Sequence, residues 1–276
     1  MKESFMMTSI KNILLITIFS LSFYSCSSIT TPSKSVANKA ELYYDYGTKY
    51  LVDKDYTKAL TNLRKALELD PSNSKINNNL GMAYFFKKDT VSALSHLKKS
   101  VELDPKNSDA RNNLASVYFY QKKYKQAYNE YQIILKDLEY TQQFRTSYNL
   151  ALIDFKFGRN TIGLQRLNKS IKENPDYCAA HYQLGSYAHK INDYDQALTH
   201  FANATKGVCM NNPAPYYQQA KMLIKLGRHD KALFSLTDII NRFPTSKYSI
   251  LAKRKLHSIN INKLEARSNN TNTNKL

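Results

Sequence analysis

Apolar residues of this chain recur four positions apart, a spacing that places them on one face of an α-helix. Ala59 and Leu63 form such a pair, and Ala93 and Leu97 form another. Glycine and proline are scarce, with 7 of each in 276 residues, and no glycine-rich loop follows a strand-like run. The pattern therefore predicts an all-α protein built from short amphipathic helices.

Two of these stretches are near copies of each other. ALTNLRKALELDPSN begins at Ala59 and ALSHLKKSVELDPKN begins at Ala93, an offset of 34 residues. That offset is the period of the tetratricopeptide repeat, a helix-turn-helix unit. Aligning the chain on this signature predicts six repeats, over residues 40–73, 74–107, 108–143, 144–177, 178–212 and 213–245.

Small residues mark the places where the two helices of a repeat cross. Leu80-Gly81 and Leu184-Gly185 provide them in first helices, and the pairs such as Ala59 and Leu63 provide them in second helices. Gly or Ala lets the helices approach closely, and the large residue four positions on fills the gap between them. A closing proline ends the second helix. It is missing from the third repeat, displaced to Pro213 in the fifth, and present in the others as Pro71, Pro105, Pro175 and Pro244.

A single helical hairpin cannot bury its apolar face alone, so neighbouring repeats must stack. The predicted fold class is an all-α, right-handed superhelical solenoid of about six tetratricopeptide repeats. Residues 246–259 mix apolar and basic side chains and are predicted to form a C-terminal capping helix. The Asn-, Thr- and Lys-rich stretch 260–276 is predicted to be a disordered tail.

The N-terminus has the composition of an export signal. Lys2 and Lys11 supply positive charge, and Ile13–Phe23 forms an apolar core of secretory length, too short for a comfortable membrane span. Cys26 follows a small residue at the end of this core, as at the cleavage site of bacterial lipoproteins. We therefore expect a lipoprotein signal peptide over residues 1–25 and a lipid on Cys26.

The lipid site departs from the lipoprotein pattern at one position, because Phe23 stands where Leu is preferred. An ordinary cleaved signal with an incidental Cys26 is the alternative. Residues 26–39 are rich in Ser, Thr, Pro and Lys and are predicted to form a flexible tether. Ser27 follows the cysteine, and lipoproteins with Asp at that place tend to stay in the inner membrane. The resemblance therefore implies anchoring at the periplasmic face of the outer membrane.

The formal net charge of +18 raises the question of a nucleic-acid partner. Lys and Arg are spread along the whole chain and interleaved with Asp and Glu, and no compact basic run stands out. The distribution favours a solvated basic surface, and no nucleic acid is expected as a partner.

Catalytic and metal-binding motifs are absent from the sequence. It contains no phosphate loop, nucleophile elbow or dinucleotide fingerprint, and the repeats leave no room for a separate catalytic domain. We therefore expect no enzymatic activity, cofactor, metal or small-molecule substrate. The six histidines form no paired metal-ligand motif: His96, His181, His189, His200, His229 and His257.

Two cysteines fall in the fifth repeat. Cys178 opens its first helix and Cys209 lies just past the end of its second helix. The two ends are neighbours in an antiparallel helical hairpin, so a disulfide is geometrically reasonable in an oxidising compartment. Two free thiols are the alternative.

The predicted working surface is the groove lined by the first helices. In repeats of this family, six positions of the first helix face that groove, and here they collect aromatic residues and asparagines. Aromatic rings supply contact area and asparagines can bond a ligand's main chain, which suits an extended or helical peptide. The first three repeats carry the densest aromatic set. The groove candidates are Tyr44, Leu51, Asn78, Asn79, Phe85, Phe86, Asn112, Asn113, Phe119, Tyr120, Tyr148, Asn149, Phe155, Tyr182 and Tyr217.

A lipoprotein signal, a short tether, about six repeats filling the mature chain and a C-terminal cysteine pair together resemble the PilF/PilW family of type IV pilus biogenesis lipoproteins. The resemblance implies a pilotin that binds secretin subunits and promotes their localisation to the outer membrane and their multimerisation. An outer-membrane adaptor for cell-wall hydrolases or barrel assembly is the alternative.

Overall fold

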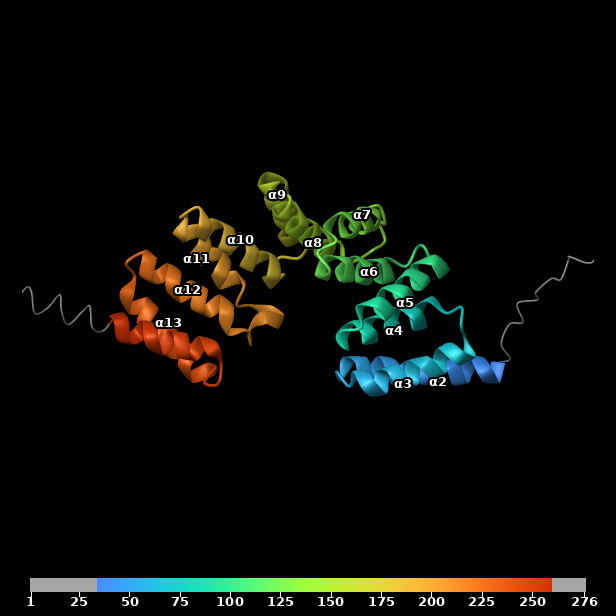
Figure 1. The fold of residues 1–276 in the computed structure, drawn as a ribbon. Helices are drawn as coiled ribbons and strands as arrows, with labels where there is room; N and C mark the ends of the chain where they lie inside the picture. The colour runs from blue at the N-terminus through green and yellow to red at the C-terminus, as the bar shows by residue number, and fades with distance from the viewer. Residues whose placement is uncertain (1–33, 260–276) are drawn as a thin grey trace, which may run out of the picture. The chain divides into compact units, whose positions relative to one another are not determined.

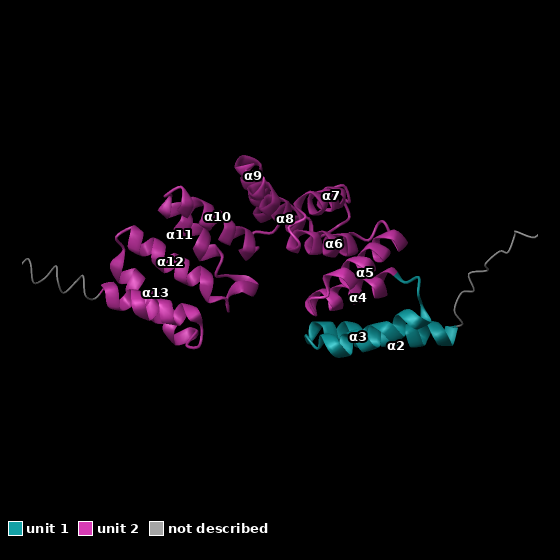
Figure 2. Cartoon of the chain, in the orientation of Figure 1, with its two compact units in different colours: residues 1–73 teal, residues 74–276 magenta. Residues whose placement is uncertain are grey.

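A computed structural model describes residues 34–259, and every regular element in that range is helical (Figure 1). The chain divides into two compact units, residues 1–73 and 74–276 (Figure 2). The predicted signal peptide, the lipid site at Cys26 and the tail 260–276 lie outside the described residues.

The described part of the first unit is one antiparallel hairpin, formed by α2 (Lys34–Val52) and α3 (Tyr56–Leu69). Its core is made by Ala59, Leu63 and Ala66, all fully buried. The helix α2 begins at Lys34, so the last part of the predicted tether, residues 34–39, is helical rather than flexible. These residues contain no glycine or proline, so nothing in them interrupts the helix.

The second unit continues the pattern of paired helices to residue 259. Helices α4, α6, α10 and α12 begin at the residues that open predicted repeats, and α8 begins one residue earlier, at Gln143. A helix over residues 247–259 follows the last pair. The pairs are α4 (Ser74–Phe86) with α5 (Thr90–Leu103), α6 (Ser108–Tyr120) with α7 (Tyr124–Ile134), α8 (Gln143–Lys156) with α9 (Asn160–Glu173), α10 (Cys178–Lys190) with α11 (Tyr194–Asn203), and α12 (Pro213–Lys225) with α13 (His229–Arg242).

Aspartate side chains start several second helices. The Asp89 carboxylate accepts a hydrogen bond from the backbone N–H of Ser92 at 3.0 Å, and Asp193 does the same from Gln196 at 3.1 Å. Each carboxylate satisfies a backbone donor that has no partner inside the helix and complements the helix dipole.

The turn inside each repeat passes through the left-handed region of backbone space. One residue per turn has a positive φ, between 59° and 74°, at an equivalent place in all six repeats. Glycine adopts this conformation at no steric cost, whereas other residues are strained in it. Only two of the six turns use glycine; the residues are Lys54, Lys88, Lys122, Gly158, Asn192 and Gly227.

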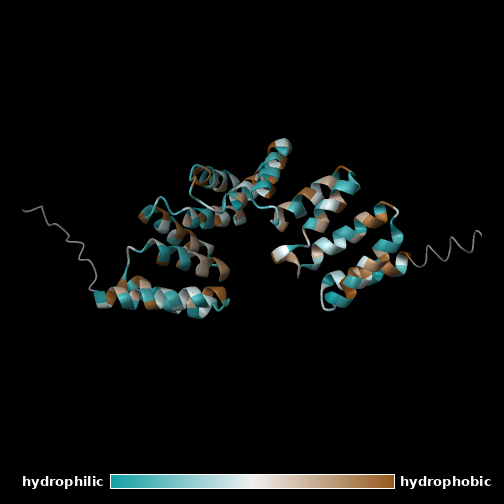
Figure 3. Ribbon diagram, turned by 180° about the vertical axis from the view of Figure 1, so that it is seen from behind, coloured by the Kyte–Doolittle hydropathy of each residue, from teal (hydrophilic) through white to brown (hydrophobic). Residues whose placement is uncertain are grey.

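Close helix contact explains the small residues of the repeat signature. A Cβ added at Gly81 would lie 2.5 Å from Cγ of Leu97, so the Leu97 side chain occupies the space that a larger residue would need. Two buried serines bond within their own hairpins: the Ser100 hydroxyl donates to the carbonyl of Ser74 at 2.7 Å, and the Ser170 hydroxyl donates to the carbonyl of Phe144 at 2.8 Å. Hydrophobic and hydrophilic segments alternate within the individual helices, as amphipathic packing requires (Figure 3).

Candidate functional site: the first-helix face

The predicted groove positions of the second unit lie on α4, α6, α8, α10 and α12. We call the surface formed by these positions the first-helix face. At its N-terminal end, Phe85 packs edge-on against Tyr120 with ring centroids 5.2 Å apart, and it lies 5.7 Å from Phe86. Phe86 is 45% exposed and Tyr120 is 62% exposed. This aromatic cluster joins two helices, and two of its residues remain partly exposed to solvent.

The other aromatic candidates serve mainly as packing. Phe119 is half-buried against Tyr124. The Phe155 ring fills the space beside Gly163, where an added Cβ would lie 2.8 Å from it. Tyr182 packs edge-on against the buried Phe201 at 5.5 Å. Similar half-buried contacts hold Tyr148 against Tyr177 and Tyr217 against Tyr248.

Asparagine side chains form hydrogen bonds with one another, both within α4 and between α4 and α6. The Asn113 side-chain amide donates to Oδ1 of Asn78 at 2.9 Å, and the Asn78 amide donates to Oδ1 of Asn79 at 3.1 Å. Their amides therefore bond one another, which leaves fewer of their groups for a ligand's main chain. Oδ1 of Asn112 is buried without a hydrogen-bond partner, and Asn149 is half-buried.

Tyr44 and Leu51, the groove candidates of the first unit, are half-buried on α2. Tyr46, on the same helix, is 48% exposed.

The last residue of each first helix changes character along the second unit. Two helices end on exposed aromatic residues and the following three end on exposed lysines. We call these residues the end series; they are Phe86, Tyr120, Lys156, Lys190 and Lys225.

Positive charge accumulates at the C-terminal part of the first-helix face. His189, half-buried near the end of α10, has a pKa lowered first by its burial and then by the positive charges of Lys221 and Lys225 on α12. The ammonium of Lys225 also lies 6.0 Å from the ring centre of Tyr194. The lysines of α12 therefore act on α10 across the face. The amino-acid sequence alone does not reveal this set, because the lysines are widely separated along the chain.

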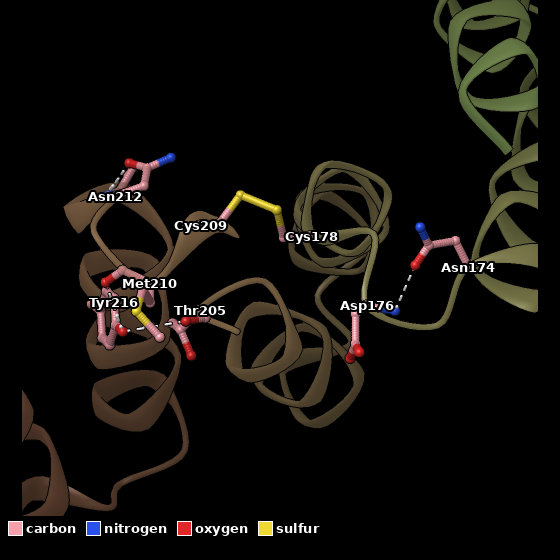
Figure 4. The surroundings of a disulfide bond; sticks show 9 residues. Asn174, Asp176, Cys178, Thr205, Cys209, Met210, Asn212 and Tyr216 are labelled. Carbon is pink, nitrogen blue, oxygen red and sulfur yellow. Dashed lines mark hydrogen bonds between the residues drawn. A yellow bond between two sulfur atoms is a disulfide. The ribbon is translucent and has the colours of Figure 1, made fainter. Parts of the chain in front are cut away.

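The structure joins Cys178 and Cys209 in a disulfide, with Cα atoms 6.2 Å apart (Figure 4). Cys178 is the first residue of α10, and Cys209 closes the short 3₁₀ helix η1 (Gly207–Cys209). The Tyr216 hydroxyl, which donates to the carbonyl of Met210 at 3.1 Å, ties the same connection to α12. The bond therefore braces an extended connection between the fifth and sixth repeats.

A buried ion cluster links the third and fourth repeats. Asp154 is fully buried, and its oxygens lie 2.6 Å from Arg159 and 2.8 Å from Arg166. Both guanidinium groups also face the ring of Tyr128, at 4.8 Å and 5.9 Å. These two cations neutralise the carboxylate and make its burial tolerable. The sequence did not predict this cluster, because its residues belong to α7, α8, α9 and the turn at residue 159.

Two histidines meet between α10 and α11. Nδ1 of the buried His181 lies 3.1 Å from Nδ1 of His200, and Nε2 of His181 lies 3.0 Å from the carbonyl oxygen of Pro175. His189, which shares a helix with His181, lies elsewhere on it, beside Tyr194. Within residues 34–259, no group of three or more His, Cys, Asp or Glu side chains could hold a metal ion.

Sequence comparison agrees with the geometry of the paired helices. Family models described as TPR or tetratricopeptide repeat match residues 47–88, 74–107, 96–129, 148–213 and 216–246. This chain is a tetratricopeptide-repeat protein. The prediction of an all-α repeat solenoid is confirmed for the part of the chain that the structure describes.

Solved structures share this repeat architecture over most of the chain. Pseudomonas aeruginosa PilF is 20% identical with a TM-score of 0.68, covering 82% of this chain and 99% of PilF. PilW, described as a widely conserved type IV pilus biogenesis factor, is 17% identical with a TM-score of 0.67, covering 80% and 97%. A tetratricopeptide repeat protein from Parabacteroides merdae is 16% identical with a TM-score of 0.59, covering 83% and 90%.

At these identities the likeness establishes the fold, and the chain has the fold of PilF and PilW along nearly their whole length. A search of curated proteins found no match. None of the helices within residues 34–259 combines the length and apolar character needed to cross a membrane. Tetratricopeptide repeats are protein-interaction scaffolds, because stacked helices create extended surfaces for a partner chain.

Proposed function

We propose that this protein is a lipid-anchored adaptor in type IV pilus biogenesis. It binds secretin subunits in the periplasm and promotes their localisation to the outer membrane and their multimerisation. The observation that carries the proposal is the shared fold with PilF and PilW, which covers 99% and 97% of those chains. The lipoprotein-like signal predicted over residues 1–25, followed by Cys26, is consistent with the proposal, because a lipid on Cys26 would hold the protein at a membrane.

Physical reasoning supports a carrier of this kind. A secretin subunit carries amphipathic surfaces that aggregate unless they are covered before insertion. The first-helix face offers the exposed rings of Phe86 and Tyr120 beside half-buried aromatic residues, which suits an apolar segment of a partner. A lipid on Cys26 would hold the covered segment at the correct membrane.

Deletion of the gene tests the proposed function in the intact cell. We expect outer-membrane fractions of the deletion strain to lose heat-resistant secretin multimers, and expression of the full chain from a plasmid to restore them. The matched variant is Cys26→Ser, which we expect to lose palmitate labelling and to leave the secretin in the wrong membrane. Normal multimer levels in the outer membrane of the deletion strain would contradict the proposal.

Co-purification distinguishes the proposed partner from the alternative one. The full chain is recovered from detergent-solubilised membranes with an affinity tag, and the retained proteins are identified by mass spectrometry. Enrichment of the secretin supports the pilus adaptor. Enrichment of cell-wall hydrolases or of barrel-assembly proteins without the secretin favours the alternative adaptor role.

A further inference from the structure

The end series of the first-helix face changes from aromatic to basic within one compact unit. Helices α4 and α6 end on Phe86 and Tyr120, whereas the next three first helices end on lysine. Lys221 adds a fourth charge one helical turn before Lys225, on the same side of α12. The face therefore presents aromatic side chains in one part and basic side chains in the other to a single bound segment.

The favourable interaction of a cation with a helix C-terminus does not by itself explain why lysines occupy these positions. A cation near a helix C-terminus interacts favourably with the helix dipole, which is the simplest explanation of Lys156, Lys190 and Lys225. That explanation omits α4 and α6, whose corresponding residues are aromatic. It also leaves Lys221 unexplained, although its charge, with that of Lys225, lowers the pKa of the facing His189.

Carboxylates that lie close to these lysines in the sequence have other bonding partners. Asp154 is held between two arginines, Asp193 caps α11, and Asp195 pairs with Arg228 at 2.9 Å. In the part of the chain that the structure describes, no ion pair reaches the lysines of this face: Lys156, Lys190, Lys221 and Lys225. These lysines on three consecutive first helices therefore have no carboxylate paired with them, an arrangement that an anionic ligand would stabilise.

We propose that Lys156, Lys190, Lys221 and Lys225 bind an acidic segment of the partner protein, in which carboxylates alternate with apolar residues. The lysines of the end series come one per repeat, and each follows a half-buried residue: Phe155, His189 or Ile224. One lysine per repeat, rather than a dense row of cations, favours a peptide whose carboxylates are separated by apolar side chains over a phosphate backbone. The inference rests on the proposed protein-binding function and adds the chemistry of the ligand.

The two parts of the face then have separate tasks. The exposed rings of Phe86 and Tyr120 contact an apolar residue of the segment, and the lysines fix its direction by contacting the acidic part. Exposed ion pairs contribute little to affinity individually, but several act together and discriminate against segments of the wrong charge.

A binding assay with a defined peptide tests the proposal. The probe is a fluorescein-labelled peptide in which Asp and Glu alternate with Leu and Phe, and anisotropy is measured with the full chain at low ionic strength. The test variant combines Lys156→Gln, Lys190→Gln and Lys225→Gln, which removes charge without placing acids at helix ends. The matched control combines Lys98→Gln, Lys172→Gln and Lys231→Gln, which are exposed lysines on second helices. Circular dichroism verifies that both variants fold.

We expect the test variant to bind the acidic peptide about tenfold more weakly than the wild type, and the control variant to bind it like the wild type. Equal weakening by both variants would mean that net charge alone attracts the peptide, and it would overturn the inference. Stronger discrimination between the variants by vesicles of phosphatidylglycerol than by the peptide would also overturn it, in favour of an anionic lipid surface.

The assay separates this inference from the proposed function. If the peptide does not distinguish the variants but the secretin is still recovered from membranes, the lysine site is rejected and the adaptor function stands. If the peptide distinguishes them but no secretin is recovered, the acidic-segment site stands and the pilus function is rejected.

Discussion

Nδ1 of His181 faces Nδ1 of His200 across 3.1 Å, between the two helices of the fifth repeat. Nε2 of His181 lies 3.0 Å from the Pro175 carbonyl oxygen, which can only accept, so Nε2 carries a hydrogen. In the neutral ring Nδ1 of His181 is then the acceptor and Nδ1 of His200 the donor.

The burial of His200 predicts a loss of stability in mild acid. Burial, followed by the neighbouring His181, lowers the pKa of His200 below its ordinary 6.5. The unfolded chain therefore binds a proton more readily than the folded chain, and the free energy of unfolding falls as the pH drops through about 6.5. Urea unfolding at a series of pH values measures the slope. His200→Gln should flatten it, and an unchanged slope in that variant would contradict the prediction.

Asp154 is expected to be the most sensitive charged residue of the described chain. Asp154→Ala leaves Arg159 and Arg166 without their buried partner and should lower the free energy of unfolding by about 3–5 kcal/mol. Asp195→Ala is the matched control, because the Asp195–Arg228 pair is exposed and should contribute at most about 1 kcal/mol. Urea denaturation monitored by circular dichroism gives both values. Similar small losses in the two variants would show that the cluster is not coupled to folding.

The disulfide should stabilise the far end of the repeats. Replacing both cysteines, as Cys178→Ser with Cys209→Ser, should cost about 2–4 kcal/mol because the unfolded chain regains the freedom of a loop spanning a sequence separation of 31. Thermal unfolding with and without reductant measures the effect, which should be absent in the double variant. Alkylation of the non-reduced mature protein followed by mass measurement is the direct check; labelling at both cysteines would show that the bridge does not form.

The turns offer a test of backbone strain that is free of side-chain contacts. Gly158 has a φ of 74°, and no atom lies within 4 Å of the place where a Cβ would be. Gly158→Ala should therefore destabilise the fold by about 1 kcal/mol through backbone strain alone. Lys88→Gly, at the equivalent turn, should not destabilise it, because glycine relieves a φ of 67°. Equal effects of the two substitutions in a urea titration would refute this explanation.

The repeat period, the helical hairpin and the places of close helix contact follow from the amino-acid sequence alone. These features depend on residues within one repeat, such as Gly81 and Leu97, whose spacing can be read directly from the sequence. The cysteine pair could also be anticipated, because the two ends of one hairpin are necessarily close.

Which candidate residues remain exposed to a partner depends on the tertiary structure. Phe155 and Tyr182 are groove candidates like Phe86 but occupy other positions of their helices, and they are half-buried in packing while Phe86 stays exposed. The pattern assigns a residue to a helix face, and the neighbouring repeat determines whether that face is covered. The burial of Asp154 between two arginines of its own hairpin likewise depends on these particular side chains. Contacts between repeats of different sequence depend on the particular side chains that pack together, and the repeat period does not specify those side chains.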